Sequence, residues 1–521
     1  MIAKIIVDNK SKQVDKPFDY LVPKELEDKI KIGSRVLVPF SSGNREIEGF
    51  CVGTADTSDS KRLKSIIRTA NDSIGFDEDM LELIEWMHKK YLASYLDIIH
   101  TIVPSGTALK TKEWIILENK SEEKSEIRRR ITEILTDNGG SMEFKELKEM
   151  CGVDIQNQVR AMIKEGTLKK EYRQSVDIKD KKIKCVKLIC DRETALESAE
   201  NLRRKAPVQA KMLEVLSENE YVSLADLQKF TNGSHSTVKA LEKKNLVNVF
   251  DMTVERDPYW NRVFEKTEKM VPTPEQEYAI DEITNSVKSG DGGIYLLHGV
   301  TGSGKTEVFM QTIENVINMG KSAIMLVPEI SLTPQMVSRF MSRFGGRVAI
   351  FHSGLSAGER YDQWKKIRDG EADIVIGARS AIFTPLKNIG VIIMDEEHSD
   401  TYKSDMSPRY HARETAIFRA SQFGAAVVLA SATPSVESYY KAQTGEYKLL
   451  EMNTRYNKNK MPEISVIDMR SELEKGNKSM LSGKLYNEIE ENLKRGEQTI
   501  LFLNRRGFST FVSCRSCGYV P

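Results

Sequence analysis

Apolar and polar residues are arranged in two different ways along the chain, and the change falls near residue 271. Before it, short apolar runs are separated by Gly, Ser, Asn and Asp, a spacing typical of β-strands joined by turns. These runs are residues 3–7, 18–23, 33–40, 48–53 and 63–68, and an amphipathic stretch at 80–92 predicts a closing helix. We therefore expect a β-rich N-terminal domain over residues 1–106.

Residues 107–257 contain two stretches of similar pattern. Each predicts helix, turn, helix, helix and a short β-wing, first over 126–172 and again over 206–250. This order is that of a winged helix, an architecture often used on DNA. A helical packing module or a protein-docking surface has the same pattern, so both alternatives stay open. The Lys-rich segment 179–187 predicts a solvated linker between the two copies.

From residue 271 onward, apolar runs alternate with helical stretches. Each run precedes a turn and a helix, which predicts buried parallel strands of one doubly wound sheet. The runs are residues 294–298, 323–327, 348–351, 373–377, 391–395 and 426–430. We expect a RecA-like lobe over 258–450, and the run at 499–504 predicts the start of a second lobe within 451–521. The predicted fold class is thus multidomain α/β.

Charge and composition limit the class of protein. Lys and Arg number 77 against 76 Asp and Glu, so any nucleic-acid contact must be local rather than spread over the chain. No apolar run is long enough to span a bilayer, and the first ten residues lack the apolar core of a secretory signal. We expect a cytoplasmic protein that makes no membrane contact. The 6 cysteines are too sparse for a disulfide framework.

The segment after the first run of the parallel sheet fits the phosphate-binding pattern G-x-x-x-x-G-K-[ST]. Backbone N–H groups of such a turn surround phosphate oxygens, and the N-terminus of the next helix adds positive potential. Lys305 would reach the β and γ oxygens of ATP, and Thr306 would ligate Mg²⁺. The predicted nucleotide-binding residues are Gly299, Val300, Thr301, Gly302, Ser303, Gly304, Lys305 and Thr306.

Two acids stand at the tip of the fifth apolar run of this sheet. Asp395 would hold the Mg²⁺, and Glu396 would orient the attacking water. Taken alone, two acids after a strand are an ordinary solvated strand end. Combined with a phosphate loop in the same sheet, they predict a catalytic site made of Lys305, Asp395 and Glu396.

The order of these motifs resembles that of superfamily-two helicases. Four further segments share the resemblance, although each alone is an ordinary β-to-α loop; they are TPEQ at 273–276, VPEISLTPQ at 327–335, GARS at 377–380 and SATP at 431–434. The resemblance implies that Gln276 reads adenine and that the second and third segments, with Arg379, grip the DNA backbone. It also implies that Ser431 and Thr433 link hydrolysis to strand movement.

Within that superfamily, residues 398–403 and 409–413 resemble the aromatic-rich loop of the primosomal replication-restart helicases. Aromatic rings can stack on unpaired bases, and Arg can hold phosphate. The resemblance implies DNA contacts by Tyr402, Arg409, Tyr410 and His411.

Residues 18–20 and 38–40 are similar to that family's pocket for the 3′ end of a leading strand. The resemblance implies that Phe18 and Tyr20 pack the terminal base, that Asp19 accepts a hydrogen bond from the terminal hydroxyl, and that Lys64 meets phosphate. The family has glycine where this chain has Ser41, which puts the loop geometry in question. From the pattern alone, the two aromatic residues are core residues of a strand.

Near the C-terminus, Cys514 and Cys517 have the C-x-x-C spacing of a zinc knuckle. They resemble the family's first knuckle, and residues 501–508 resemble the opening of its second lobe. Because structural zinc takes four ligands, the Zn²⁺ site is incomplete in this sequence, and two free thiols are the alternative. The resemblance implies that the chain is truncated and that it binds ATP and DNA with little turnover.

Taken together, the resemblance implies an ATP-dependent 3′ to 5′ DNA helicase that recognises stalled or branched forks and starts primosome assembly. The implied cofactors are ATP, Mg²⁺ and Zn²⁺. The implied partners are forked or single-stranded DNA, single-strand binding protein, other primosome proteins and the replicative helicase loader. Two alternatives stay open: a fork-binding scaffold that recruits replication proteins without motor activity, and an ATPase that has no role on nucleic acid.

Overall fold

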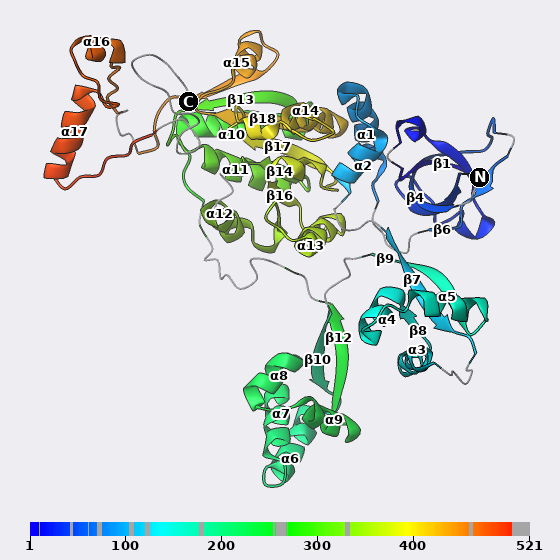
Figure 1. Ribbon diagram of the computed structural model, residues 1–521. Coiled ribbons are helices and arrows are strands. Elements are labelled where there is room, and N and C mark those ends of the chain that lie inside the picture. Colours follow the sequence, from blue (N-terminus) through cyan, green and yellow to red (C-terminus); the bar gives the residue numbers. More distant parts are fainter. Residues whose placement is uncertain are drawn as a thin grey trace. The chain divides into compact units, whose positions relative to one another are not determined.

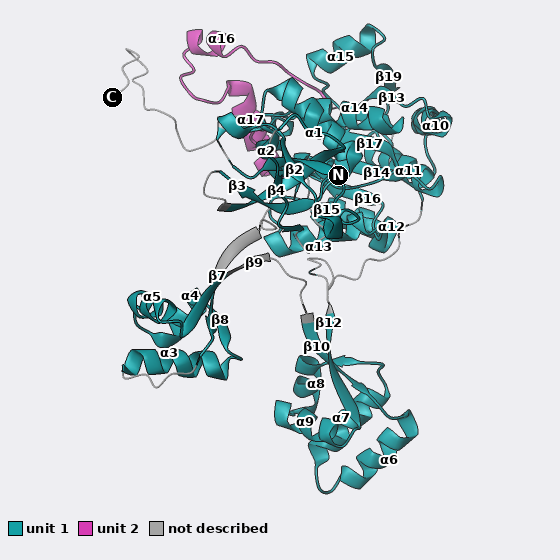
Figure 2. Ribbon diagram, turned by 90° about the vertical axis from the view of Figure 1, so that its right-hand side faces the viewer, with its two compact units in different colours: residues 1–458 teal, residues 459–521 magenta. Residues whose placement is uncertain are grey.

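The computed structural model describes most of the chain, namely residues 1–9, 11–41, 45–60, 62–69, 75–103, 109–119, 125–176, 182–253, 256, 267, 269–328, 334–457 and 462–502. Its contacts divide the chain into two compact units, residues 1–458 and residues 459–521 (Figure 2). Within the described ranges, every helix is too short or too polar to cross a bilayer.

The N-terminal region is built on a six-stranded sheet in the order β5-β2-β1-β4-β3-β6 (Figure 1). Its strands are β1 Ile2–Val7, β2 Phe18–Leu21, β3 Arg35–Phe40, β4 Arg45–Ala55, β5 Lys64–Ser65 and β6 Arg68–Thr69. The predicted strands are confirmed, except that the run at 63–68 divides into β5 and β6 at opposite edges of the sheet. It divides because the Ile66 amide donates to Leu21 and the Ile67 amide donates to Leu37, which joins the two edges.

Helices α1 (Glu78–Tyr91) and α2 (Tyr95–Ile102) follow this sheet, and α1 confirms the helix predicted at 80–92. The buried positions of α1 recur at helical spacing; they are Met80, Leu83, Ile84 and Met87. They share a core with α14 (Ala412–Phe423) of the parallel-sheet lobe. At this contact the Trp86 ring stacks on Phe418, with 4.6 Å between ring centroids. The N-terminal region is therefore packed directly against the lobe.

Two small modules confirm the predicted repeat of helices. The first contains β7 Leu109–Leu117, α3 Glu126–Asp137, β8 Ser141–Glu143, α4 Phe144–Cys151, α5 Gln156–Lys164 and β9 Leu168–Val176. The second contains β10 Lys182–Leu188, α6 Arg192–Leu202, α7 Pro207–Ser217, β11 Val222–Ser223, α8 Leu224–Thr231, α9 His235–Lys243 and β12 Val247–Thr253. Their sheets have matching orders, β8-β7-β9 and β11-β10-β12.

The linker predicted at 179–187 is wrong over residues 182–187, where the structure has strand β10. Cys185 and Val186 are buried in the second module, whereas Lys184 and Lys187 are exposed. Successive side chains of a strand point to opposite faces, so Lys184 and Lys187 lie on different faces of β10. The strand forms because the segment pairs with β12 over its whole length and Val186 packs in the apolar core of the module.

The lobe contains a seven-stranded parallel sheet in the order β15-β16-β14-β17-β18-β13-β19 (Figure 1). Its strands are β13 Gly293–Gly299, β14 Ser322–Leu326, β15 Val348–Phe351, β16 Ile374–Gly377, β17 Ile389–Asp395, β18 Ala426–Ser431 and β19 Lys448–Met452. The six predicted strands are confirmed. The sequence did not predict β19, which adds an edge strand beside β13 and crosses the expected domain boundary at 450.

Both faces of this sheet are covered, as expected for a doubly wound fold. Along β17, Ile392 and Met394 belong to one apolar core, and Val391 and Ile393 belong to the other. The helices of the lobe are α10 Pro274–Ser289, α11 Lys305–Asn318, α12 Pro334–Phe344, α13 Ala357–Arg368, α14 and α15 Val436–Gln443. Because the strands are parallel, their carboxyl ends meet at one edge, where ligands of such sheets bind.

In the second unit the described residues, 462–502, contain α16 (Met469–Glu474) and α17 (Gly483–Lys494). The strand predicted at 499–504 is absent from its described part, residues 499–502. Ile500 and Phe502 are 93% and 86% exposed. A parallel strand requires hydrogen-bonded neighbours, and the described part of this unit contains none.

Replacing Trp86 with Ala should loosen the contact between α1 and α14, because it removes the ring that stacks on Phe418. The loop before α14 contains Lys403 and Arg409, two trypsin sites. We expect tryptic cleavage after these residues to speed up by about tenfold, since cleavage follows local opening. Mass spectrometry of timed digests measures the rates. Trp86→Phe, which keeps a ring, is the control, and equal rates in both variants would contradict the packing role.

Candidate active site

Strand β13 runs into a tight glycine turn, residues 299–304, and α11 begins at Lys305. Gly302 and Gly304 have left-handed φ angles of +82° and +87°. A Cβ atom at Gly304 would lie 2.4 Å from Nε2 of Gln276, so this position requires glycine for space as well as for conformation. The Lys305 Nζ donates to the Gly299 carbonyl at 2.7 Å, which holds the ammonium over the turn.

The glycine turn and the two acids at the end of β17 line one cavity of about 530 Å³. Its lining includes Thr301 through Lys305, Thr306, Asp395 and Glu396. The volume suits a small organic ligand, and the donors suit a magnesium-bound triphosphate. A hydroxyl and a carboxylate are hard oxygen ligands of the kind Mg²⁺ takes alongside phosphate oxygens. The structure thus brings Lys305, Thr306, Asp395 and Glu396 together, as the sequence predicts.

Burial and neighbouring charge shift the pKa values of two groups in this cavity, Asp395 and Lys305. Burial, together with the neighbouring Glu396 carboxylate, raises the pKa of Asp395 to about 6. Burial also lowers the pKa of Lys305, and the charges of Glu396 and Asp395 oppose that shift. Glu396 itself has a left-handed φ of +47°, an uncommon conformation for a residue with a side chain. A divalent cation between the carboxylates and a phosphate would relieve this repulsion.

Gln276 has a structural task beside the cavity. It is 1% exposed, and its Nε2 donates to the Ser303 carbonyl at 2.7 Å. Its Oε1 accepts from the Thr273 amide at 2.9 Å, within the capping box that begins α10. The side chain therefore ties the glycine turn, through Nε2, to the N-terminus of α10, through Oε1. The implied adenine contact stays a prediction.

One imidazole connects the acids to the segment after β18. His398 Nδ1 lies 2.8 Å from Ser431 Oγ and 3.7 Å from a Glu396 carboxylate oxygen. Ser431 Oγ in turn accepts from the Thr433 amide at 2.9 Å. Ser431 and Thr433, the predicted coupling residues, are thus connected to Glu396 through His398. The motifs alone assign no role to His398, although its place directly after the acids was the available signal.

Glu397 is a second residue that sequence reasoning missed. Its carboxylate is fully buried and accepts from the Ser435 amide at 2.6 Å and from Ser438 Oγ at 2.9 Å. Arg413, at the start of α14, donates from Nη1 to the same carboxylate at 3.2 Å. Glu397 follows β17, Arg413 lies in the first turn of α14, and the two serines lie at the start of α15. The Glu397 carboxylate therefore fixes the starts of both helices against the end of β17.

The structure contradicts two of the predicted base-stacking contacts in this conformation. Tyr402 is fully buried, and its hydroxyl donates to the carbonyls of Leu326 at 3.0 Å and Asp395 at 2.6 Å. Tyr410 is 3% exposed and packs edge-to-face on Phe383. Each ring packs in the apolar core of the lobe, although Tyr410 also lines the second cavity described below. These tyrosines anchor the loop 398–411 on the sheet edge.

The other predicted DNA-binding residues near this loop differ in their exposure and in their protein partners. Arg379, in the 3₁₀ turn Arg379–Phe383, donates from Nη1 to the carbonyls of Thr401 at 3.3 Å and Lys403 at 2.5 Å. His411 caps α14 by accepting from the Arg413 amide, and burial lowers its pKa. Arg409 is exposed and is therefore open to a phosphate. Of the segment 327–335, residues 329–333 lie outside the described residues.

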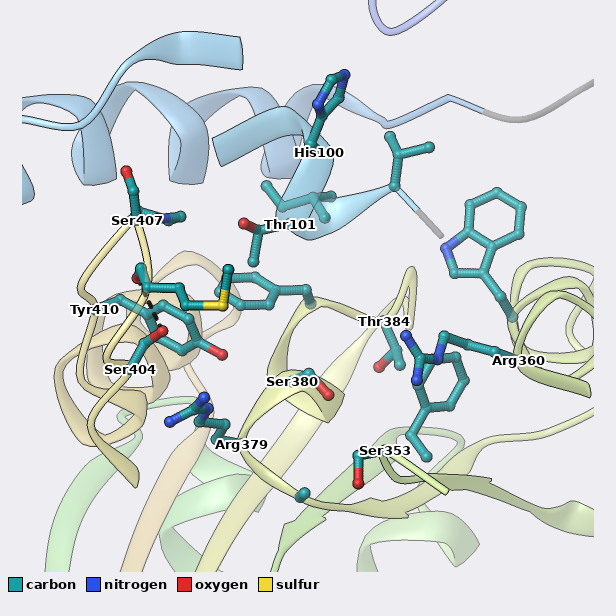
Figure 3. A pocket seen from close by; sticks show the side chains of 18 residues that line it. His100, Thr101, Ser353, Arg360, Arg379, Ser380, Thr384, Ser404, Ser407 and Tyr410 are labelled. Atoms are coloured by element: carbon teal, nitrogen blue, oxygen red, sulfur yellow. Dashed lines mark hydrogen bonds between the residues drawn. The ribbon is translucent and has the colours of Figure 1, made fainter. Parts of the chain in front are cut away.

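A second cavity, of about 510 Å³, lies where this loop meets α2 and the ends of β15 and β16 (Figure 3). Arg360 and Arg379 stand on two sides of it, and Ser380 lies between them (Figure 3). Guanidinium and hydroxyl groups are the donors that proteins use most on phosphate oxygens. Met406, 78% exposed, adds an apolar edge. The arrangement suits a sugar-phosphate backbone.

The predicted 3′-end residues meet at one edge of the N-terminal sheet. Phe18 packs edge-to-face on Phe40 with 5.7 Å between centroids, and Lys64 pairs with Tyr20 across β2 and β5. Asp19 lies between Phe18 and Tyr20 on β2. Its carboxylate accepts from Ser58 Oγ at 2.5 Å. Tyr20, however, is 4% exposed and donates its hydroxyl to the Pro39 carbonyl. Its ring belongs to the core, so the packing of a base by Tyr20 is contradicted in this conformation.

The family has glycine where this chain has Ser41, and Ser41 keeps the backbone conformation that a glycine could adopt there. Its φ is +61°, so the residue adopts the left-handed conformation that glycine would adopt without strain. The cost for a residue with a Cβ is roughly 1–2 kcal/mol. The Ser41 carbonyl accepts from Lys64 Nζ at 2.6 Å. The loop thus holds the lysine in place in spite of the substitution.

The predicted zinc ligands Cys514 and Cys517 lie outside the described residues, as do residues 503–508. Among the residues that the structure describes, no cluster of three or more His, Cys, Asp or Glu could hold a metal ion. The zinc site therefore stays a prediction from the sequence.

Comparisons with known proteins agree with this geometry. Residues 4–104 match the family described as the 3′DNA-binding domain of PriA, and residues 273–442 match the DEAD/DEAH box helicase family. The replication restart protein PriA of Bacillus subtilis is 41% identical over 529 residues, covering 100% of this chain and 64% of that protein. The protein of the same name from Synechocystis is 34% identical, covering 96% and 61%. The chain thus spans less than two thirds of the length of these relatives.

Among solved structures, RecG bound to a three-way DNA junction is similar over 37% of this chain and 24% of that chain, at 26% identity. The TM-score is 0.28, too low to support a conclusion by itself.

Glu397→Ala should unlock the segment after β18. The change leaves Arg413, whose side chain is 16% exposed, without the fully buried carboxylate with which it pairs, and breaking a buried pair costs about 3–5 kcal/mol. We expect amide hydrogen exchange in residues 431–438 to speed up by roughly 100-fold or more. Exchange in β14 should stay unchanged. Glu437→Ala, a neighbouring change in the first turn of α15, is the control; similar exchange in both variants would show that the ion pair does not hold this segment.

Proposed function

Because the chain belongs to the PriA family of replication restart proteins, we propose that the whole protein is an ATP-dependent DNA helicase that recognises stalled or branched forks. It moves 3′ to 5′ and starts primosome assembly. The observation that supports this most is the single cavity lined by the glycine turn, Lys305, Asp395 and Glu396. That cavity is joined through His398 and Ser431 to the segment that would couple hydrolysis to movement.

In the proposed mechanism each residue of the cavity has one task. Lys305 holds the β and γ phosphate oxygens, and Thr306 with Asp395 holds Mg²⁺. The metal, when bound, neutralises charge on the phosphates. Glu396 orients the attacking water, with His398 beside it at hydrogen-bonding reach of Ser431. A change at Ser431 and Thr433 therefore alters the surroundings of the catalytic carboxylate.

The proposed DNA contacts lie on two surfaces. Beside the loop 398–411, exposed Arg409 and the cavity of Figure 3, with Arg360 and Arg379, would take the backbone of a single strand. At the N-terminal sheet, Asp19 and Lys64 would take a 3′ end, with Phe18 against its base. Forked DNA then engages the N-terminal region and the lobe of the same chain.

The remaining features of the proposal come from the family. The partners are single-strand binding protein, other primosome proteins and the replicative helicase loader, and the protein works in the cytoplasm. Cys514 and Cys517 would supply the first two ligands of a Zn²⁺ site. An arginine that completes the ATP site from the second lobe contributes roughly 10³- to 10⁵-fold in related phosphoryl transfer. A polypeptide of residues 1–521 alone should therefore bind Mg·ATP but hydrolyse it slowly.

Lys305→Ala tests the ATP site. The change removes the ammonium that would hold the phosphates, so we expect the DNA-stimulated ATPase rate of the full-length protein to fall by roughly 100-fold or more. Lys288→Ala, an exposed position at the end of α10, is the control. A coupled ATPase assay with and without forked DNA gives the rates. Fork binding without any ATPase activity in the wild-type protein would favour the scaffold, and turnover indifferent to DNA would favour an ATPase of another kind.

Gel-shift titration with forks that carry a free or a 3′-phosphorylated leading strand tests the end pocket. A carboxylate that accepts from the terminal hydroxyl should favour the free end by about tenfold, because a phosphate there would meet Asp19 with like charge. Asp19→Asn should remove most of this preference, and Asp59→Asn, an exposed neighbour, should keep it. Equal affinity of the wild-type chain for both forks would rule the pocket out.

A further inference from the structure

The segment that follows β19, residues 453–457, passes over the glycine turn. Val300 donates its amide to the Met452 carbonyl at 3.1 Å, and Tyr456 donates its amide to the Gly302 carbonyl at 2.9 Å. We call residues 453–457 the connector, because the chain continues from them into the second unit. Its backbone is therefore tied directly to the nucleotide-binding turn.

The connector is held on its other side by the first turn of α10. Both the amide and Oγ1 of Thr454 donate to a Glu275 carboxylate oxygen, at 3.3 and 2.9 Å. Glu275 immediately precedes Gln276, whose amide braces Ser303. The connector thus lies fixed between the start of α10 and the glycine turn.

This placement brings the Tyr456 side chain to the rim of the nucleotide cavity. Tyr456 is among the residues that line the cavity, and it is 43% exposed. The other lining residues in the described part of the chain have no aromatic ring, and the apolar ones are Met270 and Met310. An aromatic ring at the rim, with thioethers nearby, is a surface on which a flat base can pack.

The polar groups of the cavity decide which end of a nucleotide meets this ring. Lys305, Thr306 and Asp395 hold the phosphate end. The base must therefore extend away from them along the glycine turn, toward Gln276 and the connector. Each polar atom of the Gln276 amide already has a protein partner, the Ser303 carbonyl and the Thr273 amide. Hydrogen bonding by Gln276 can thus give only part of the binding energy of the base.

We propose that Tyr456 stacks on the purine base of the bound nucleotide. This inference rests on the proposed ATP site and names the group that holds the far end of its ligand. Stacking depends on the area of the ring system and little on its edge. The stack therefore favours purine over pyrimidine nucleotides, and the choice between adenine and guanine is left to polar groups such as Gln276.

Calorimetry on the full 521-residue chain separates the base from the phosphates. Tyr456→Ala should weaken Mg·ADP binding by roughly 5- to 160-fold, the range expected for loss of one base–aromatic stack. Mg·tripolyphosphate, which has no base, should bind the variant as it binds the wild type. Tyr456→Phe should stay within about threefold of the wild type for both ligands, because the ring is kept. Tyr440→Ala, an exposed tyrosine outside the cavity, is the matched control.

Each possible result either supports or overturns stacking by Tyr456. Loss confined to Mg·ADP, rescued by Tyr456→Phe, supports stacking. Equal loss for Mg·ADP and Mg·tripolyphosphate overturns it, since the connector would then only support the turn. Mg·ADP affinity unchanged in Tyr456→Ala also overturns it and leaves the proposed function intact. Absence of any Mg·ADP uptake by the wild-type chain overturns both.

Discussion

The parallel pairing of β17, β18 and β13 is the constraint on which the active site depends. In this register Asp395 stands opposite Ala430, and Ser431 stands opposite His298. Three segments that are far apart in sequence therefore end side by side: the acids, the Ser-Ala-Thr segment and the glycine turn. No single loop could be shifted without changing the register of a strand that is buried on both faces. The sheet thus holds the predicted catalytic groups side by side.

Acidic residues whose burial or charge disfavours folding are also gathered at this end of the sheet. The buried carboxyl of Asp395 has a raised pKa, Glu396 has a left-handed backbone, and Glu397 is buried with Arg413. Three consecutive acids in such a place are unfavourable for folding alone, because each requires a partner to offset its desolvation. Glu397 has found its partners within the protein. A bound cation and nucleotide would supply the missing partners of Asp395 and Glu396, which is the physical reason to propose a function for these two acids.

Sequence alone predicted those parts of the molecule whose signal is local. The six parallel strands, the glycine turn and the acids at the end of β17 follow from apolar runs and short motifs, and the structure has all of them. Strand β19 was missed because its short run, KLLEM, mixes charged with apolar residues. The segment of β10 resembles a linker in sequence because Lys184 and Lys187 are exposed, one on each face of the strand. In both cases tertiary contact, rather than local pattern, makes the strand.

The contacts of individual side chains were the least predictable part of the site. Tyr402 donates to Leu326, which lies 76 residues away in sequence, and nothing near the tyrosine indicates that partner. The same holds for Glu397 with Ser438, 41 residues on. A ring in an aromatic-rich loop is equally able to stack on a base or to enter a core. Only the position of neighbouring strands decides between these outcomes.

The buried tyrosines give the loop 398–411 a different physical meaning from the one its composition indicates. Tyr402 holds it to the Asp395 carbonyl, Arg379 holds it to the 3₁₀ turn after β16, and the His411 amide donates to the Tyr91 hydroxyl of α1. A continuous set of contacts therefore connects the N-terminal region to Asp395 at the end of β17. Continuity permits coupling between sites but does not create it, because coupling requires two arrangements that a ligand distinguishes. The exposed residues Arg409 and Met406 project from this otherwise anchored loop, so a bound strand that pulled on them would act on the same contacts that position Asp395.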